Sequence, residues 1–473
     1  MKGKVILKKI GIGIITTALL LSKPMQMVYA EEGNNPEATE EAADANPEEK
    51  TKGQIAAEEA AKKQASYDTP VDTNALENWP TGPNVYAASA IVMDIDSGAV
   101  LYGKQIDEKR YPASITKLLT VLVALENANL TDKITFTDEC LNFLEWDDAN
   151  IGMRVGEEIT LEEALYGGLL ASANEVSYAV AKNVGENLGI GYDGFIELMN
   201  ERAQELGCKN SHWVNANGLH DENHYTTAYD MALIASAVYQ KEDFQRIEQT
   251  LEYKLGKTNL VEEERILDQN HKMLWPENYY YYPYAKAGKT GYTDQAKTTL
   301  VTMSDNGNMR LAVVVLGDYG VDAYEDTRNI FEDGFGNFRK VMLSELSKSE
   351  DIESFADNNA YVVLPEAVDF TNADSDVNNA DMATAVYTYQ GNIVGKAEVK
   401  VSDIYKAKQS AAVTEKKDSK KSTQTGASKD EEISWKGYLP LIVMGGITVA
   451  ILFVFLPIWL HLQRKRRKNR RRR

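Results

Sequence analysis

A serine and a lysine three positions apart carry the clearest chemistry in this chain of 473 residues. A serine hydroxyl is a weak nucleophile unless a base lies within hydrogen-bond reach. At the start of a helix, positions i and i+3 share a face, so the amine of Lys117 is expected beside the hydroxyl of Ser114. For Lys117 to accept a proton near neutral pH, burial or a second cation must lower its pKa. The spacing predicts an acylated serine with a lysine base; the alternative is a capped helix with its lysine in solvent.

A second pair of polar side chains, Ser172 and Asn174, follows an apolar run and is expected in a loop between two helices. From there, a hydroxyl and an amide can both face the nucleophile. Ser172 would relay the proton of the leaving group, and Asn174 would hold the substrate backbone and the lysine base. The alternative is an ordinary helix cap. Another Ser-x-Asn triplet, residues 304–306, lies between two apolar strands and is predicted to be a hairpin loop.

The third motif is the single Lys-Thr-Gly triplet of the chain, just ahead of two predicted strands, where an edge strand can line a cleft. Lys289 supplies a second cation, which can bind a substrate carboxylate and lower the pKa of the lysine base. Thr290 adds a hydroxyl, and Gly291 lets the backbone approach a ligand closely. The backbone N–H of Tyr292 is then the natural partner of the Ser114 N–H in an oxyanion hole.

Strand and helix signals alternate along residues 80–348, which we predict to be the catalytic domain that positions these groups. Alternating apolar residues predict a hairpin over 88–102, and two later strands and a helix near 323–347 close the domain. Helical periodicity predicts helices over 115–127, 161–171, 175–186, 193–206 and 226–240. This order predicts an α+β sandwich, in which an antiparallel sheet packs on a helical cluster. A small β domain is expected over 349–405.

Both ends of the chain predict an exported protein anchored in the cell membrane, with its catalytic domain outside the cytoplasm. Residues 1–30 have the charged start, apolar run and small-residue cleavage site of a signal peptide, with an uncleaved anchor as the alternative. Residues 434–462 are expected to cross the bilayer as a helix, because the chain is uncharged and mostly apolar from Gly437 to Gln463, and the basic tail 463–473 is expected in the cytoplasm. Residues 31–79 are predicted to be a disordered acidic linker, and 406–433 a polar linker.

The composition argues against several kinds of partner. The net charge is −20 although both ends are basic, so the body is strongly acidic and we predict no nucleic-acid partner. The histidines lack metal-ligand spacing, except for the pair His220 and His224, so we predict no metal and no cofactor. Cys140 and Cys208 can pair or stay free. The tyrosine-rich run 279–284 can stack on glycan or pack a loop.

Together the three motifs resemble the signature of penicillin-binding proteins and class A β-lactamases, with the second motif in the looser form Ser-x-Asn. The wider sequence is similar to the D-alanyl-D-alanine carboxypeptidases of peptidase family S11, the low-molecular-weight penicillin-binding proteins. The stretches that carry this similarity are residues 90–98, 111–117, 168–174, 217–219, 224–232 and 288–293.

The resemblance implies a transpeptidase-like fold and removal of the terminal D-alanine from peptidoglycan stem pentapeptides. Ser114 would be acylated by the penultimate D-alanine, and water would then release the tetrapeptide. β-Lactam antibiotics would acylate the same serine and leave slowly. The chain departs from the family pattern at Glu175, where Asp is usual, and at Lys297, where many members have Gly. Its full membrane span also differs from the amphipathic helix that family members more often carry.

Two other functions remain open from the sequence. A β-lactamase would need a deacylating carboxylate on a loop after the second motif, typically in the pattern Glu-x-x-Leu-Asn, which the sequence lacks. A non-catalytic peptidoglycan-binding or regulatory protein would keep the pocket without the chemistry. The intact Ser114, Lys117 and Lys289 argue against this second alternative.

Overall fold

The structure is a computed structural model that describes residues 52–377 and 383–409. The chain divides into two compact units, residues 1–57 and 58–473. Helix α1 (Lys52–Tyr67) crosses this boundary, and every other element given below lies in the second unit.

Several predicted segments lie outside the described residues. They are the signal peptide (1–30), the membrane span (434–462), the basic tail (463–473) and most of the polar linker (406–433). In the part of the chain that the structure describes, no helix is both long enough and apolar enough to cross a bilayer.

An antiparallel five-stranded sheet forms the centre of the catalytic domain, in the order β2-β1-β9-β8-β7. Its strands are β1 (Ser89–Asp94), β2 (Val100–Lys104), β7 (Ala285–Thr293), β8 (Lys297–Asp305) and β9 (Arg310–Asp318). β1 and β2 form the predicted hairpin, and β1 pairs with β9, which the chain reaches only after the helical block. β7 is an edge strand that pairs with β8 alone, so the Lys-Thr-Gly triplet lies on a free edge of the sheet.

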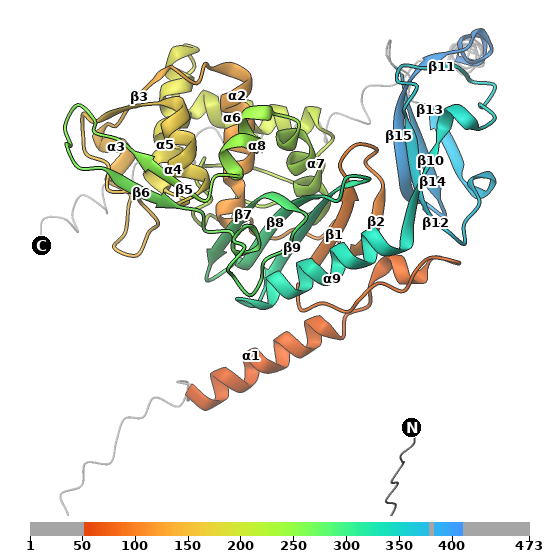
Figure 1. Cartoon of the computed structure of the whole chain (residues 1–473), viewed down its shortest axis with the longest axis horizontal. Coiled ribbons are helices and arrows are strands. Elements are labelled where there is room, and N and C mark those ends of the chain that lie inside the picture. The colour runs from red at the N-terminus through yellow and green to blue at the C-terminus, as the bar shows by residue number, and fades with distance from the viewer. Residues whose placement is uncertain (1–51, 378–382, 410–473) are drawn as a thin grey trace, which may run out of the picture. The chain divides into compact units, whose positions relative to one another are not determined.

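Alternate residues of the sheet enter two different cores, because successive side chains of a strand point to opposite faces. Ile91 and Met93 of β1 belong to the core shared with the helical block, whereas Ala90 and Val92 belong to the second core. Helix α7 (Ala228–Tyr239) contacts β1 and β9 from the first side. Helix α9 (Asp322–Asn337) covers the second side and runs along the sheet in Figure 1.

The helical block is built around α2 (Lys117–Asn127), which is buried from its first residue through Ala124. A helix whose residues are mostly apolar around its circumference belongs in a core, which explains its central place. Around it lie α3 (Asp138–Leu141), α4 (Leu161–Leu169), α5 (Asn174–Asn187), α6 (Gly191–Glu205) and α8 (Glu242–Glu248). Two short ribbons complete the block: β3 (Lys133–Thr135) with β4 (Glu158–Thr160), and β5 (Glu252–Leu255) with β6 (Arg265–Asp268).

The remaining strands follow α9. They are β10 (Phe338–Met342), β11 (Ile352–Phe355), β12 (Tyr361–Pro365), β13 (Asp374–Val377), β14 (Ala383–Tyr389) and β15 (Asn392–Val401). β10 pairs with β12, and the other four form a sheet in the order β11-β15-β14-β13. The helix predicted near 323–347 therefore ends at Asn337, because the next residues are extended and pair with β12.

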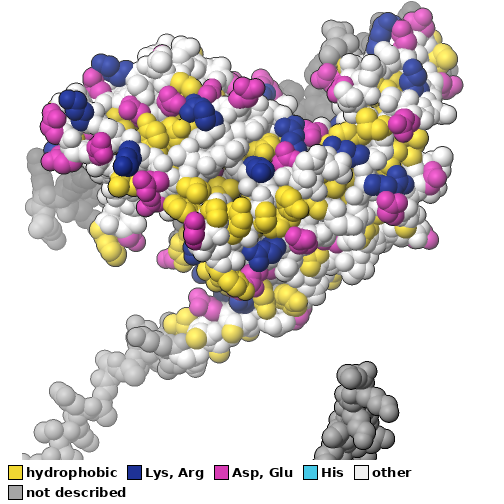
Figure 2. Space-filling view, viewed as in Figure 1, with side chains coloured by type: hydrophobic (Ala, Val, Ile, Leu, Met, Phe, Trp, Pro, Cys, Tyr) yellow, Lys and Arg dark blue, Asp and Glu magenta, His cyan; other side chains and the backbone are white. Residues whose placement is uncertain are grey.

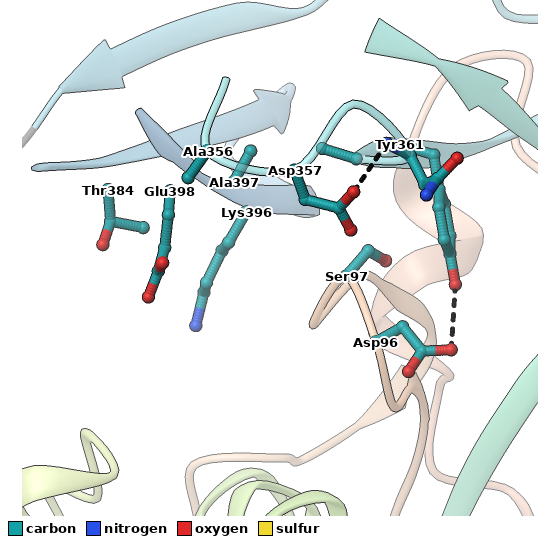
Figure 3. Close-up of a pocket in the computed structure, with 11 residues that line it drawn as sticks. Asp96, Ser97, Ala356, Asp357, Tyr361, Thr384, Lys396, Ala397 and Glu398 are labelled. Carbon is teal, nitrogen blue, oxygen red and sulfur yellow. Dashed lines mark hydrogen bonds between the residues drawn. The ribbon is translucent and has the colours of Figure 1, made fainter. Parts of the chain in front are cut away.

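These strands contact the catalytic domain at the turn between β1 and β2. The hydroxyl of Tyr361 donates hydrogen bonds to Asp94 (3.0 Å) and Asp96 (3.3 Å), and Figure 3 shows the bond to Asp96. The backbone N–H of Lys396 donates to the carbonyl of Ser97 (2.7 Å). This junction lies at the β1–β2 side of the sheet, and β7 forms the opposite edge.

The prediction of a disordered linker over 31–79 is wrong for its second half. Residues 52–67 form α1, and the chain beyond them packs on the folded unit. Trp79 is buried, stacks on Tyr389 at 5.9 Å between ring centroids and meets Phe338 edge-on at 5.2 Å. The composition of the segment is too polar for it to fold alone, but a single large aromatic side chain anchors it to a core formed elsewhere.

Candidate active site

The serine and lysine of the first motif meet at the start of α2. Residues 113–116 form one turn of 3-10 helix, and α2 begins at Lys117. The buried Lys117 amine lies 2.8 Å from Ser114 Oγ, 2.8 Å from Asn174 Oδ1 and 2.7 Å from the carbonyl oxygen of Asn217. A neutral amine has two N–H groups and one lone pair. Since the amide and carbonyl oxygens can only accept, they take the two N–H groups and leave the lone pair for the proton of Ser114.

The surroundings of Lys117 favour this neutral form. Burial lowers its pKa well below the ordinary value for lysine, and the nearby charge of Lys289 lowers it further. The carboxylates of Glu175 and Asp148 raise the pKa of Lys117, but by less than burial and Lys289 lower it. These effects favour the neutral amine, which is the form that an acylating serine needs in its base.

The second motif connects α4 to α5. Ser172 has a positive φ of 60°, and Asn174 opens α5 with its backbone N–H bonded to the carbonyl of Ala149 (2.8 Å). Both side chains are buried and turned into the site: Asn174 contacts Lys117, and Ser172 accepts a hydrogen bond from Lys289 (2.9 Å). The helix-cap alternative is therefore insufficient, because both side chains contact a buried lysine.

The third motif brings the second amine to the same place. Lys289 is 1% exposed, and its amine donates to Ser172 Oγ (2.9 Å) and to the carbonyl of Thr290 (2.9 Å). Burial lowers its pKa to about 8, while the neighbouring carboxylate of Glu248 favours the charged form. The two buried lysines are thus unequal: Lys289 keeps its proton more readily than Lys117 does.

The edge of β7 also presents backbone donors beside Ser114. In an antiparallel strand, alternate N–H groups point toward and away from the paired neighbour. The Gly288 N–H bonds to Glu248 rather than to β8. The register of β7 against β8 is regular from Gly288 to Tyr292, so the Tyr292 N–H, four residues later, also points away from β8. A Cβ on Gly291 would lie 2.9 Å from the Ser114 nitrogen and 2.4 Å from Thr299 Oγ1. The strand therefore approaches the nucleophile as closely as only glycine allows.

These groups line one cavity of about 710 Å³. Its walls include the side chains or backbone of Ser114, Ser172, Asn174, Thr290, Gly291 and Tyr292. All the predicted site residues thus lie on this cavity or, as Lys117 and Lys289, bond directly to a residue of its wall. The arrangement can hold a C-terminal carboxylate at one amine, deprotonate a serine at the other and stabilise an oxyanion between two backbone N–H groups.

The comparisons with known proteins agree with this geometry. The family model described as Peptidase_S11, D-alanyl-D-alanine carboxypeptidase, matches residues 76–320. The chain belongs to this peptidase family. Over 240 residues it is 32% identical to the D-alanyl-D-alanine carboxypeptidase DacF of Bacillus subtilis, which covers 49% of this chain and 57% of that relative. It is 28% identical to DacA of Haemophilus influenzae, over 59% of this chain and 70% of that one.

A solved structure gives the same result for the fold. The DD-transpeptidase of Streptomyces K15 superimposes with a TM-score of 0.50 and 27% identity, covering 54% of this chain and 99% of that one. The prediction of a transpeptidase-like α+β fold, with an antiparallel sheet and helices, is confirmed for the catalytic domain.

Sequence reasoning assigned no role to the loop that supplies the carbonyl of Asn217 to Lys117. Its neighbour Gly218 has φ +90°, and a Cβ there would lie 2.0 Å from the carbonyl oxygen of Ala113. This loop therefore packs directly on the turn that carries Ser114. An Asn-Gly dipeptide is a common turn, so its sequence signal alone could not reveal this contact.

The two histidines with possible metal-ligand spacing, His220 and His224, contact neighbouring side chains of this S11 member. His224 is buried, and its Nε2 lies 2.8 Å from Thr116 Oγ1, behind the serine turn. Burial lowers its pKa to about 3, so it is neutral. His220 lines the cavity and packs edge-on against Tyr111. Among residues 52–377 and 383–409, no group of three or more metal-ligating side chains gathers.

Other features left open by the sequence have definite places. Cys140 and Cys208 are both free. The triplet 304–306 lies at the β8–β9 hairpin: Ser304 and Asp305 are the last two residues of β8, and only Asn306, whose Oδ1 accepts two backbone N–H groups, lies in the predicted loop.

The tyrosine-rich run mostly packs a loop. Tyr280 stacks on Tyr324, Tyr282 stacks on Phe331, and Tyr279 is exposed. Figure 2 shows apolar side chains gathered over the region of β7–β9 on the visible face.

The two departures from the family pattern differ in kind. Glu175 is buried behind the second motif, where its Oε1 accepts the Ile151 N–H (2.7 Å), and burial raises its pKa. Through this hydrogen bond Glu175 holds Ile151 in place, two positions after Ala149, which lines the cavity together with Asp148. Lys297 opens β8 with φ +57°, the left-handed region in which glycine is unstrained.

Proposed function

We propose that this chain is a serine-type D-Ala-D-Ala carboxypeptidase of the cell wall. It would hydrolyse the terminal peptide bond of peptidoglycan stem pentapeptides through an acyl-enzyme on Ser114. The observation that carries the proposal is the convergence on one cavity of a serine, a neutral buried amine 2.8 Å from its hydroxyl and a second amine that keeps its charge.

In the acylation step, Lys117 takes the proton of Ser114 as its oxygen attacks the penultimate D-alanine carbonyl. The oxyanion that forms accepts hydrogen bonds from the N–H groups of Ser114 and Tyr292. Lys289 binds the terminal carboxylate. Ser172 passes its proton to the departing D-alanine nitrogen and takes in its place the proton that Lys117 received from Ser114. Asn174 holds the Lys117 amine in place through a 2.8 Å hydrogen bond.

Deacylation uses the same groups with water as the nucleophile. Lys117, again neutral once the departing amine has been protonated, takes a proton from water that attacks the ester carbonyl, and Ser114 leaves with that proton. A β-lactam has a carboxylate and a strained amide in the same relation, so it should acylate Ser114 as well. The sequence lacks the Glu-x-x-Leu-Asn pattern of a deacylating carboxylate, which supports slow release rather than β-lactamase turnover.

The proposal is tested by incubating the full-length chain with a stem pentapeptide and following the product by mass spectrometry. Loss of one alanine with the native chain, and none with Ser114→Ala, is the expected result. An intact pentapeptide with the native chain, under conditions where it still reacts with penicillin, would favour the non-catalytic alternative. Turnover of a β-lactam faster than minutes would favour a β-lactamase.

We also propose that the enzyme is exported and anchored in the cell membrane by residues 434–462. The support is the sequence alone: a signal-like start, an apolar stretch free of charged residues from Gly437 to Gln463 and a basic tail after it. Protease digestion of intact cells tests this topology. The catalytic domain should be cleaved from outside, and a tag placed after Arg473 should be protected until the membrane is opened.

A further inference from the structure

A buried carboxylate lies behind the third motif, and the reaction described above does not use it. Glu248 ends α8 and is fully buried. Its Oε2 accepts the backbone N–H of Gly288 (3.1 Å) and the amide of Gln269 (3.3 Å). Its Oε1 is buried with no hydrogen-bond partner among the described residues. A buried carboxylate oxygen without a partner is costly unless a nearby positive charge compensates for it.

The neighbouring positive charge is that of Lys289, which follows Gly288 in β7. The hydrogen bonds of its amine go to Ser172 Oγ and the Thr290 carbonyl, both of which are uncharged. A buried ammonium with neutral partners tends to lose its proton, because burial disfavours the charged form. Lys289 therefore needs an anion close by to remain charged in the empty cavity, and Glu248 meets that need from behind the strand.

We infer that Glu248 is a positioning residue for the carboxypeptidase reaction: its buried negative charge keeps the Lys289 amine protonated, so that Lys289 can bind the terminal carboxylate of the substrate. This inference rests on the proposed function. It also explains how two buried lysines in one site acquire opposite roles, since the carboxylate lies behind Lys289 rather than beside the Ser114 base.

The other titratable groups around the pair do not supply this charge. His271, which packs against Gly288, has its pKa lowered to about 3 by burial and by Lys289, so it is neutral. On the side of α4, Glu162 pairs with Arg246. On the cavity side, Lys117 is the other buried amine, and Glu175 and Asp148 act on it; Lys272 also lines the cavity and is a cation, not an anion.

The pair predicts a particular pH dependence. Burial raises the pKa of Glu248 to about 7 and lowers that of Lys289 to about 8, and each charge favours the charged form of the other. Above pH 7 the negative charge of Glu248 keeps the pKa of Lys289 higher than it would otherwise be, so the amine loses its proton at a higher pH. Removing that anion lowers the pKa of Lys289, so carboxylate binding is lost at a lower pH. At pH 5.5 Lys289 is protonated with or without the Glu248 charge, so removing that charge has little effect on carboxylate binding.

The test is Glu248→Gln in the full-length chain, because glutamine can still accept the Gly288 N–H and lacks the charge. We expect kcat/KM for a stem pentapeptide, and the acylation rate by a fluorescent penicillin, to fall about fivefold at pH 8, with the alkaline limb moved about one pH unit lower. At pH 5.5 the variant should match the native chain within about twofold. The matched control is Glu242→Gln, an exposed change on the same helix that should leave both profiles unchanged.

Glu248→Asp keeps the charge on a shorter side chain and should retain the native alkaline limb. The inference is overturned if Glu248→Gln keeps the native pH profile. It is also overturned if the rate of that variant falls by the same factor at every pH, as expected for a purely structural hydrogen-bond acceptor, or if Glu248→Asp shifts the alkaline limb as far as Glu248→Gln does. A native chain that releases no D-alanine would refute the proposed function instead, and the penicillin rates would still decide the role of Glu248.

Discussion

At the scale of residues, the chemistry depends on a difference between two buried amines. The pKa of Lys117, which lies 2.8 Å from Ser114, is well below its ordinary value, whereas Lys289 is held by Ser172 and the Thr290 carbonyl and keeps its charge more readily. The types and spacing of the three motifs predicted this convergence. They did not predict the role of Glu248, because a carboxylate 41 positions before Lys289 carries no motif and only the packing of α8 on β7 brings it near.

Lys289→Ala should weaken the reaction with the pentapeptide and with penicillin together, because both ligands present a carboxylate to this amine. A hydrogen bond to a charged group contributes about 1.5–3 kcal/mol, so kcat/KM and the acylation rate should each fall about 10- to 150-fold. Steady-state kinetics and a fluorescent penicillin measure the two losses. Acylation kinetics equal to those of the native chain would count against this role of Lys289.

The acid limb of the penicillin acylation rate should report Lys117. Burial and the charge of Lys289 lower the pKa of Lys117, so raising the pH through that lowered pKa frees the base and increases the rate. At acid pH the amine is protonated and Ser114 has no base. We expect the rate to rise as the pH is raised from 4.5 to 7. A rate that is level or higher at the acid end would exclude Lys117 as the base.

At the scale of elements, the free edge of β7 decides where the oxyanion is held. The close approach of Gly291 to the Ser114 nitrogen leaves no room for a side chain. Gly291→Ala should therefore push the strand away from the nucleophile and reduce acylation about 100- to 1000-fold, the usual effect of losing an oxyanion donor.

The measurement is the acylation rate together with thermal unfolding. The control is Gly336→Ala on α9, where a Cβ would have open space. That change should leave acylation intact and stabilise the helix slightly, since alanine is the better helix former. Nearly native acylation in Gly291→Ala would show that β7 does not supply the oxyanion hole.

In the catalytic domain the long helices follow from local patterns, and several short elements do not. α2, α4, α5, α6 and α7 each contain two or more turns of apolar periodicity, and the sequence predicts all five. α3, α8 and the ribbons β3–β4 and β5–β6 were missed, because three to seven residues hold too few repeats to show a period. Asn217 was missed as a site residue for another reason: it contributes its backbone carbonyl, which no side-chain pattern can reveal.

At the scale of the whole molecule, the segment of residues 68–79 belongs to the folded unit rather than to a linker. Trp79 anchors it between Phe338 and Tyr389, and its indole N–H donates to the carbonyl of Leu101 (2.9 Å). The prediction of disorder failed because it judged the segment by its own composition. Its partners lie in the β hairpin and in strands about 300 residues later.

Trp79→Ala should destabilise the protein by about 3–5 kcal/mol, the usual cost of removing a buried tryptophan. Denaturant unfolding measures this change. Trp146→Ala is the matched control, because that side chain is 94% exposed and its loss should leave the free energy of unfolding unchanged. A Trp79→Ala chain as stable as the native one would mean that the segment is not anchored in this way.

The most direct test of the central claim is to locate the covalent adduct formed with penicillin. The full-length chain is treated with benzylpenicillin, digested with trypsin, and its peptides are sequenced by mass spectrometry. We predict one penicilloyl group per chain, on the hydroxyl of Ser114, and none after Lys117→Ala, which removes the base while leaving the serine. An adduct on another residue, or undiminished labelling of Ser114 without the Lys117 amine, would contradict the account.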